Sequence, residues 1–550
     1  MIYITRSVSS CRPPTQNEPL MRADLNSWIS YLPYFWKPVV VRMFFLGFSA
    51  GLPLLLIFSS LSLWLREAGV DRSAVTYFSW AALGYSFKFI WAPLVGNMPI
   101  PLLTDKLGQR RSWLIISQLA IMLSIAAMAL TDPVASDHGL TIMAIAAVAL
   151  GFSSATQDIV IDAYRIETGS SKVQALMSSM YITGYRVGLI VAGAGALFLA
   201  DYLGSSTNEY NYSAWRSTYL VMSALMSVGI ITTLIIPEPN KKNLDRDHLF
   251  TYRDHMALLM TFILAIIGFI AVFYFSSEYT LTIKSILSAT LHNNEFASIF
   301  TEGIRLALGI GVAYLIARLL MVSNLTNQDL VNSFYISPIR DFFQRYSGRQ
   351  ILLLLALISL YRISDIVLGV ISNVFYSDMG FSKRDIAAVV KTFGLMMALV
   401  GGFLGGLIAL RLGILPTLFL GALLSSLTNL LFLLLASGSP NIEMLYVVIA
   451  ADNLSAGIAT AAFVAFLSSL VNISFTAMQY AIFSSTMTLL PKILGGYSGS
   501  IVTALGYPNF FIITFLLGLP VLIVIIMLKL DRTFTATKTD NTKEDASVTG

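Results

Sequence analysis

Charge and cysteine are the two things that this sequence has little of. Only 12% of its 550 residues are charged, whereas 56% are hydrophobic; soluble globular proteins carry about 25% charged residues. A soluble fold cannot cover so much apolar surface, but helices that face lipid can. The single cysteine, Cys11, excludes an internal disulfide framework and a cysteine-ligated metal site, and four scattered histidines do not suggest a metal site either.

Motifs that the sequence lacks exclude further classes of function. The phosphate-binding pattern G-x-x-x-x-G-K-[ST] does not occur, so no ATP hydrolysis by this chain and no ATPase subunit is expected. No spacing of Ser, His and Asp predicts a hydrolase triad, and the long loops at 201–216 and 277–302 offer little to a membrane enzyme, which needs clustered carboxylates. A non-transporting sensor needs an output domain, for which the tails are too short. We therefore expect no enzyme, no metal, no cofactor and no nucleic-acid partner.

What is present is a series of apolar segments, each long enough to cross a membrane, for which about 20 residues are needed. About fourteen segments qualify: 40–63, 74–97, 112–131, 140–163, 175–200, 214–236, 256–276, 303–322, 350–376, 385–410, 413–436, 443–470, 477–503 and 508–530. They predict an all-α integral membrane protein with two six-helix bundles, 37–237 and 350–531. Between them, 238–349 is expected to carry two additional transmembrane helices. Residues 1–36 and 532–550 are expected to be disordered arms.

Basic residues lie mainly in alternate loops, which predicts the orientation in the bilayer. Arg110 and Arg111 follow the second span, and Lys241 and Lys242 follow the sixth, whereas the loop at 131–139 contains no Lys or Arg. Loops rich in Lys and Arg face the cytosol, so both termini are expected to be cytosolic.

The loop after the second span contains a motif. Gly96 is followed by Asp105-Lys-Leu-Gly-Gln-Arg-Arg111, which resembles the G…D-R-x-G-R-R loop of the major facilitator superfamily. The corresponding loop of the second bundle, 405–413, has no acidic residue. Asp105, Arg110 and Arg111 are therefore predicted to form a cytosolic gate, and the architecture to be a major-facilitator fold with about fourteen spans.

Two carboxylates in the stretch 151–165 are the most informative residues. Asp158 and Asp162 are four apart, so they share one face of a helix. An ionised carboxylate in hydrocarbon costs at least about 2.5–3.5 kcal/mol, so such residues usually face an interior pathway. The other polar or charged residues within predicted spans are Lys88, Gln157, Arg186, Arg362, Asp365, Lys391, Asp452 and Gln479. Cations there would suit an anionic substrate, and carboxylates near them could load and release protons.

For some of these residues, a purely structural role is the alternative to a role in transport. Asp162 could instead latch to Arg110 or Arg111 near the cytosolic end of its helix. Lys88 could extend towards the headgroups, and Arg362 and Asp365, which are three apart, could simply neutralise each other.

Several glycine pairs have the small-xxx-small spacing that lets membrane helices approach closely. They are Gly47 with Gly51, Gly401 with Gly405, and Gly402 with Gly406. We expect them to serve helix packing.

Short strings through both bundles resemble one family, the AmpG-type muropeptide permeases. The strings are Gly47-Phe-Ser-Ala-Gly-Leu-Pro53, Phe87-Lys-Phe-Ile-Trp-Ala-Pro93, Ser154-Ala-Thr-Gln-Asp-Ile-Val-Ile-Asp-Ala163, Gly184-Tyr-Arg-Val-Gly188, Leu360-Tyr-Arg-Ile-Ser-Asp365, Lys391-Thr-Phe-Gly394, Gly457-Ile-Ala-Thr-Ala-Ala-Phe-Val-Ala465 and Ser474-Phe-Thr-Ala-Met-Gln479. The family's Q-D-x-x-x-D motif falls on Gln157, Asp158 and Asp162, its second-span lysine on Lys88 and its fifth-span arginine on Arg186. Arg362 stands where the family is expected to have lysine, and Asp452 where it often has glutamate.

The resemblance implies proton-driven import of GlcNAc-1,6-anhydroMurNAc and its peptides across the bacterial inner membrane, for peptidoglycan recycling and, indirectly, β-lactamase induction. The expected substrate-binding residues are Lys88, Gln157, Arg186, Arg362, Lys391 and Gln479, and the expected proton-coupling residues are Asp158, Asp162, Asp365 and Asp452. The aromatic rings of Tyr85, Tyr185 and Tyr361 could stack on sugar rings. A transporter of the same fold with another anionic cargo, such as acetyl-CoA, stays open.

Overall fold

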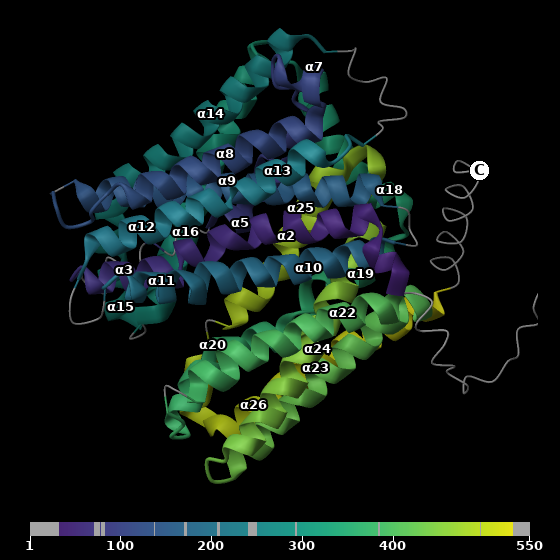
Figure 1. The fold of residues 1–550 in the computed structure, drawn as a ribbon. Coiled ribbons are helices and arrows are strands. Elements are labelled where there is room, and N and C mark those ends of the chain that lie inside the picture. The colour runs from purple at the N-terminus through teal and green to yellow at the C-terminus, as the bar shows by residue number, and fades with distance from the viewer. Residues whose placement is uncertain are drawn as a thin grey trace, which may run out of the picture.

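The structure, a computed structural model, describes residues 32–70, 78, 83–136, 138–169, 173–205, 210–239, 250–291, 294–382, 385–495 and 497–531. All regular elements in these ranges are helices (Figure 1). The expected arms therefore lie mostly outside the described residues. One part of the N-terminal arm differs from the prediction: Leu32–Trp36 forms a 3-10 helix, η1, because Phe35 is buried and stacks on Phe403, with ring centroids 4.2 Å apart.

The first bundle contains the helices before residue 239. They are α2 (Pro38–Ile57), α3 (Ser59–Glu67), α5 (Leu83–Phe87), η3 (Lys88–Ile90), α6 (Ala92–Asn97), α7 (Leu103–Leu107), α8 (Gln109–Ala129), α9 (Gly139–Thr168), α10 (Gln174–Ile190), η4 (Val191–Gly195), α11 (Ala196–Tyr202), α12 (Tyr212–Leu225) and α13 (Ser227–Ile235). Apolar runs produce these helices because hydrocarbon offers no other partner for backbone N–H and C=O groups.

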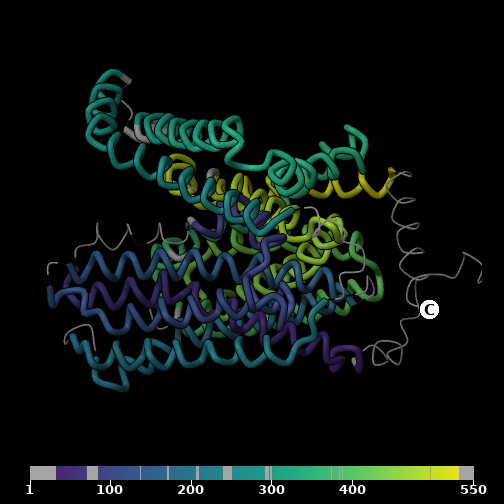
Figure 2. Tube along the Cα trace, turned by 90° about the horizontal axis from the view of Figure 1, so that it is seen from above, coloured from purple at the N-terminus to yellow at the C-terminus, as the bar shows by residue number. Residues whose placement is uncertain are grey.

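A central segment follows. It contains the hairpin α14 (Tyr252–Phe275), α15 (Ser277–Leu291) and α16 (Asn294–Val322), and then α17 (Gln328–Val331), η5 (Asn332–Ile336) and α18 (Ser337–Arg345). The hairpin lies on the outer side of the molecule (Figure 2). Only 11% of the most apolar window of α14 and 6% of that of α16 is buried, so most of their surface is free to face lipid.

The second bundle contains α19 (Gly348–Leu360), α20 (Ile363–Asp378), η6 (Ile386–Phe393), α22 (Gly394–Leu412), α23 (Ile414–Ser437), α24 (Ile442–Leu470), η7 (Ile473–Phe475), α25 (Thr476–Gly495) and α26 (Ser498–Leu530). Helix α19 starts with a capping box, in which Ser347 and Gln350 satisfy each other's backbone N–H groups. Helix α26 is kinked at Gly506, which has a φ of +77°.

The expected count of fourteen spans is not confirmed. Twelve helices among the described residues are long and apolar enough to cross a membrane. Two expected spans are missing from that set. The span at 74–97 is broken into α5, η3 and α6, with part of it outside the described residues, and the span at 477–503 is divided between α25 and the start of α26.

Glycine packing sets the position of α10, which carries the candidate residues Tyr185 and Arg186. A methyl group at Gly47 would overlap the carbonyl group of Tyr181, and one at Gly51 would overlap that of Tyr185. Helices α2 and α10 therefore touch backbone to backbone, as the small-xxx-small spacing predicts.

Candidate functional site

Asp162 lies between two cations. Its Oδ2 atom is 3.6 Å from Nζ of Lys88, and its Oδ1 atom is 3.2 Å from Nη2 of Arg165. The three side chains are at most 8% exposed. The alternative in which Asp162 latches to Arg110 or Arg111 is wrong, because those two arginines bind other groups, described below.

Lys88 reaches Asp162 because the helix is interrupted at this point. Residues Lys88–Ile90 form a 3-10 turn between α5 and α6, and the Lys88 side chain turns inward and is 7% exposed. The structure therefore does not support the alternative in which Lys88 extends to the headgroups.

Gln157 and Asp158 lie next to this pair on α9 and are also buried. Neither amide atom of Gln157 has a hydrogen-bond partner within the described part of the chain, and Oδ1 of Asp158 has none there either. Asp158 is close enough to Lys88 and Asp162 for their charges to interact. Buried polar groups are nearly always hydrogen-bonded, so unpaired ones point to a bound species, such as water or a substrate group.

A second charged group lies in the second bundle. Arg362 occupies the break between α19 and α20, and its Nε is 3.4 Å from Oδ2 of Asp365. The same guanidinium also donates a hydrogen bond to Thr460 on α24. Asp452, on α24, accepts a 3.4 Å hydrogen bond from Thr428 on α23. Arg362 and Asp365 thus pair, as one alternative predicts, but Arg362 also connects two helices.

Arg186 is a cation of the first bundle whose charge interacts with a cation of the second bundle. It lies on α10, is half-buried, and is close enough to Arg362 of the second bundle for the two positive charges to repel each other. An anion bound near two like charges would stabilise both of them. Lys391 is exposed on the π-helix η6. Tyr361 stacks on Phe463 in the second bundle's core, with centroids 4.3 Å apart, so its ring is not presented to a sugar.

Gln479 lies away from these groups, near the ends of α18 and α25. Its Oε1 accepts hydrogen bonds from Arg345 and from the backbone of Asn472, while its Nε2 donates to Asp341 and to the carbonyl of Pro338. Because the side chain is saturated by protein groups, we do not include Gln479 in the proposed substrate site.

The predicted gate residues do not form one cluster. Arg110 makes two hydrogen bonds with Glu167, of 2.9 and 2.6 Å. Arg110 also donates to Thr476 of the second bundle over 3.3 Å. Arg111 instead donates to the backbone carbonyls of Thr233 and Leu234, within the first bundle. Asp105 is exposed on α7.

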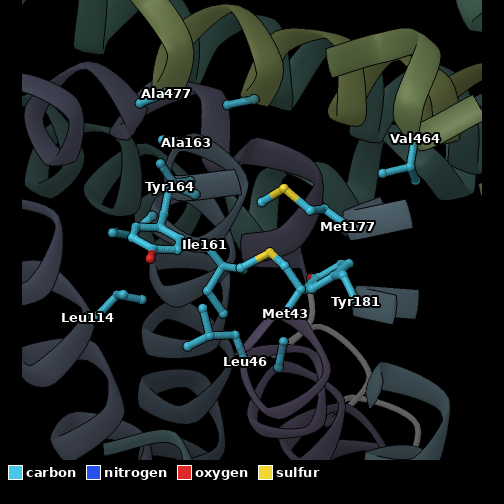
Figure 3. Packing of buried hydrophobic residues seen from close by; sticks show 14 of the residues in the cluster. Met43, Leu46, Leu114, Ile161, Ala163, Tyr164, Met177, Tyr181, Val464 and Ala477 are labelled. Carbon is cyan, nitrogen blue, oxygen red and sulfur yellow. The ribbon is translucent and has the colours of Figure 1, made fainter. Parts of the chain in front are cut away.

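We call the end of the molecule that holds the Arg110–Glu167 pair the Arg110 end; it lies on the right in Figure 1. Here the bundles touch through the hydrogen bonds of Arg110 with Thr476, Arg165 with Ser468, and Ser179 with the carbonyl of Gly402. Apolar contacts reinforce them: Figure 3 shows Val464 and Ala477 of the second bundle beside residues of the first, in one buried cluster. The Arg110 end is therefore closed.

Two residues of this end were not predicted from the sequence. Glu167 neutralises Arg110, and Arg165, fully buried, binds Asp162 and reaches the second bundle. The sequence does contain a signal for Arg165, because it follows Asp162 by three positions and residues three apart share one face of a helix. Nothing in the sequence distinguishes Glu167 from an ordinary surface acid at a helix end.

The two helix bundles come from the two halves of the sequence, close against each other at one end, and carry charged residues at mid-span. This arrangement defines a secondary membrane transporter. The family profile described as Major Facilitator Superfamily matches residues 43–326 and 353–550. The chain belongs to the major facilitator superfamily and, within it, to the AmpG-type transporters.

Its relatives are transporters rather than enzymes. It is 30% identical to "Putative transporter AmpG 4" of Rickettsia felis, over 88% of this chain and 95% of that one. It is 26% identical to "Anhydromuropeptide permease" of Escherichia coli K12, over 90% of this chain and 81% of that one. Among solved structures, the proton:xylose symporter XylE aligns with a TM-score of 0.56 at 13% identity, over 92% and 96% of the two chains, which shows the fold alone.

Proposed function

We propose that this protein imports GlcNAc-1,6-anhydroMurNAc and its peptides across a bacterial inner membrane. The proposal rests on the cations that the two bundles carry at mid-span, Arg186 on α10 and Arg362 at the break between α19 and α20, whose charges interact. The peptide of an anhydro-muropeptide carries carboxylates, and guanidinium groups bind carboxylates with two parallel hydrogen bonds. The relative named anhydromuropeptide permease supports this cargo.

The Arg110 end is proposed to face the cytosol, together with both termini. Basic residues gather in the loops at this end, among them Lys106 and Arg111, as the positive-inside rule requires. With the Arg110 end closed, substrate is proposed to enter from the opposite side. Imported cargo would enter peptidoglycan recycling and, indirectly, β-lactamase induction.

Transport is proposed to be coupled to protons through the buried carboxylates Asp158 and Asp162 and the half-buried carboxylates Asp365 and Asp452. Asp158 is the first candidate, because its Oδ1 has no hydrogen-bond partner among the described residues and it lies near Lys88. A carboxylate whose partner is a nearby cation changes its proton affinity when that cation turns to a substrate. Lys88, Gln157 and Lys391 are proposed to complete the binding site.

A binding experiment tests the cargo. Purified protein would be titrated with GlcNAc-anhydroMurNAc-tripeptide, with the disaccharide that lacks the peptide, and with acetyl-CoA. We expect the tripeptide form to bind more tightly than the free disaccharide, and Arg186→Gln and Arg362→Gln each to remove this difference, at a cost of about 1.5–3 kcal/mol per lost charged hydrogen bond. The exposed Lys529→Gln serves as a control. Tight binding of acetyl-CoA without binding of the muropeptide would refute the cargo and favour the alternative.

A further inference from the structure

The turn that carries Lys88 exists because of a proline. Pro93 has no N–H group, and its ring clashes with the carbonyl four residues earlier in a regular helix, so η3 separates α5 from α6 at this point. The N–H group of Leu94 donates to the carbonyl of Trp91, at 3.0 Å, instead of reaching back to Ile90. The carbonyl of Ile90 therefore receives no described backbone hydrogen bond, and a carbonyl in this position needs a donor from elsewhere.

A tyrosine of the central segment supplies that donor. The hydroxyl of Tyr335, on η5, donates a 3.1 Å hydrogen bond to the carbonyl of Ile90. The preceding residue, Phe334, is buried in the same apolar cluster as Trp91, and η5 packs on α6. A buried neighbour therefore keeps Tyr335 in place beside the turn.

The central segment is fixed on both sides of Tyr335. Before it, the hydroxyl of Thr326 is hydrogen-bonded to that of Thr261 on α14. After it, Arg345 of α18 donates a 3.0 Å hydrogen bond to the carbonyl of Leu470, at the end of α24. The hydroxyl of Tyr335 thus reaches the turn from a segment that is held by both the hairpin and the second bundle.

The Lys88 turn has other neighbours as well. The indole N–H of Trp91 donates a 3.1 Å hydrogen bond to Thr156 on α9, and η3 packs on α25 of the second bundle. Of the two hydrogen bonds, the one from Tyr335 acts on the backbone of the turn itself. In this arrangement Lys88 is 7% exposed and its Nζ is 3.6 Å from Oδ2 of Asp162.

We propose that Tyr335 is a positioning residue for Lys88: its hydroxyl, by donating to the carbonyl of Ile90, holds the turn in the conformation that directs Lys88 towards Asp162. Without the hydroxyl, the Ile90 carbonyl is unpaired, the turn relaxes, and the Lys88 amine leaves Asp162 more often. The central segment, which joins the two bundles in the sequence, thereby shapes the binding site. The proposal rests on the proposed function only for the part that Lys88 plays in binding the cargo.

The reactivity of the Lys88 amine tests its position without any cargo. Purified protein would be pulsed with acetic anhydride, and the acetylation of each lysine would be followed by mass spectrometry of its peptides. Lys88 of the parent should react slowly because it is buried and ion-paired, whereas the exposed Lys106 reacts fast and serves as the internal reference. Tyr335→Phe should raise the rate at Lys88, relative to Lys106, by about two- to tenfold, the range that the loss of one neutral hydrogen bond produces.

Two further variants calibrate this measurement. Tyr314→Phe, which removes an exposed hydroxyl from α16 of the same central segment, is the matched control and should leave the Lys88 rate unchanged. Asp162→Asn removes the partner of Lys88 and should raise the rate, which shows that the reagent senses the pair.

A binding measurement shows whether Tyr335 acts through Lys88. The Kd of GlcNAc-anhydroMurNAc-tripeptide would be measured for the parent, Tyr335→Phe, Lys88→Gln and the double variant. We expect Tyr335→Phe to weaken binding about twofold or more in the parent and to change it by less than that in Lys88→Gln, because the positioned amine is then already absent. A purely structural role would instead lower the melting temperature and weaken binding equally in both backgrounds.

The proposal is overturned if Lys88 reacts at the parent's rate in Tyr335→Phe, or if Tyr335→Phe weakens binding by the same factor with and without Lys88. If the protein does not bind the muropeptide, the proposed cargo fails, while the acetylation rates still decide the role of Tyr335. Conversely, normal cargo binding together with an unchanged Lys88 rate would remove the role of Tyr335 alone.

Discussion

Removal of Glu167 should open the Arg110 end. Glu167→Ala deletes both hydrogen bonds to Arg110, of 2.9 and 2.6 Å, between side chains that are 8% and 5% exposed. Breaking a buried ion pair by removing one partner costs about 3–5 kcal/mol. The substitution also removes the 2.5 Å hydrogen bond that Thr476 of the second bundle donates to Glu167. Arg110 keeps its bonds to the carbonyl of Gly96 and to Thr476, so we use the low end, about 3 kcal/mol. Because 1.4 kcal/mol is a factor of ten, the closed-to-open ratio should fall by roughly a hundredfold.

The distance between spin labels at two exposed positions, Lys106 on the first bundle and Ser474 on the second, measures this ratio directly by double electron–electron resonance in a Cys11→Ser background. The matched control is Glu443→Ala, which removes an exposed carboxylate and should change the ratio by less than about 0.5 kcal/mol. The cost falls on the closed state because Arg110 becomes hydrated when the bundles separate. An unchanged distance distribution, together with a lower melting temperature, would refute the reasoning and make the pair a support of the first bundle only.

Three further substitutions test the packing. Gly406→Leu would place side-chain atoms against Ser179 of the other bundle, so the same spin-label pair should report an open Arg110 end, and a closed one would contradict us. Gly51→Leu would overlap the backbone of Tyr185, so size-exclusion chromatography should show little monodisperse protein; a normal yield would show that α2 and α10 can separate. Gln479→Ala should lower stability by about 1–3 kcal/mol, seen as a lower melting temperature, with the substrate Kd unchanged; a weaker Kd would return Gln479 to the substrate site.

The helical architecture could be predicted from the sequence because apolar segments must form helices in a bilayer. The burial of Asp158 and Asp162 followed from the same argument, since a carboxylate in hydrocarbon must face the interior. The span count could not be predicted in the same way. One expected span is interrupted by the 3-10 turn Lys88–Ile90, and another is divided between α25 and α26; hydropathy alone does not detect such breaks.

Only the local pair of Arg362 with Asp365 could be predicted, and the partners that lie far away in the sequence could not. Asp162 pairs with Lys88, 74 positions earlier in the sequence, and Arg110 with Glu167, 57 positions later. Such contacts depend on how the bundles pack, which no local pattern encodes. Gln479 shows the reverse case: its position in a family-like string suggested substrate binding, but neighbouring Asp341 and Arg345 occupy its hydrogen-bonding atoms.

The most direct test of the central claim is uptake into proteoliposomes that contain the purified protein. Radiolabelled GlcNAc-anhydroMurNAc-tripeptide would be supplied with and without an inward proton gradient, to the parent and to Asp158→Asn. We predict that the parent accumulates the label only with the gradient and that Asp158→Asn does not. Equal accumulation with and without the gradient, and in the parent and Asp158→Asn, would contradict proton coupling. An absence of uptake by correctly folded parent protein would contradict the proposed cargo.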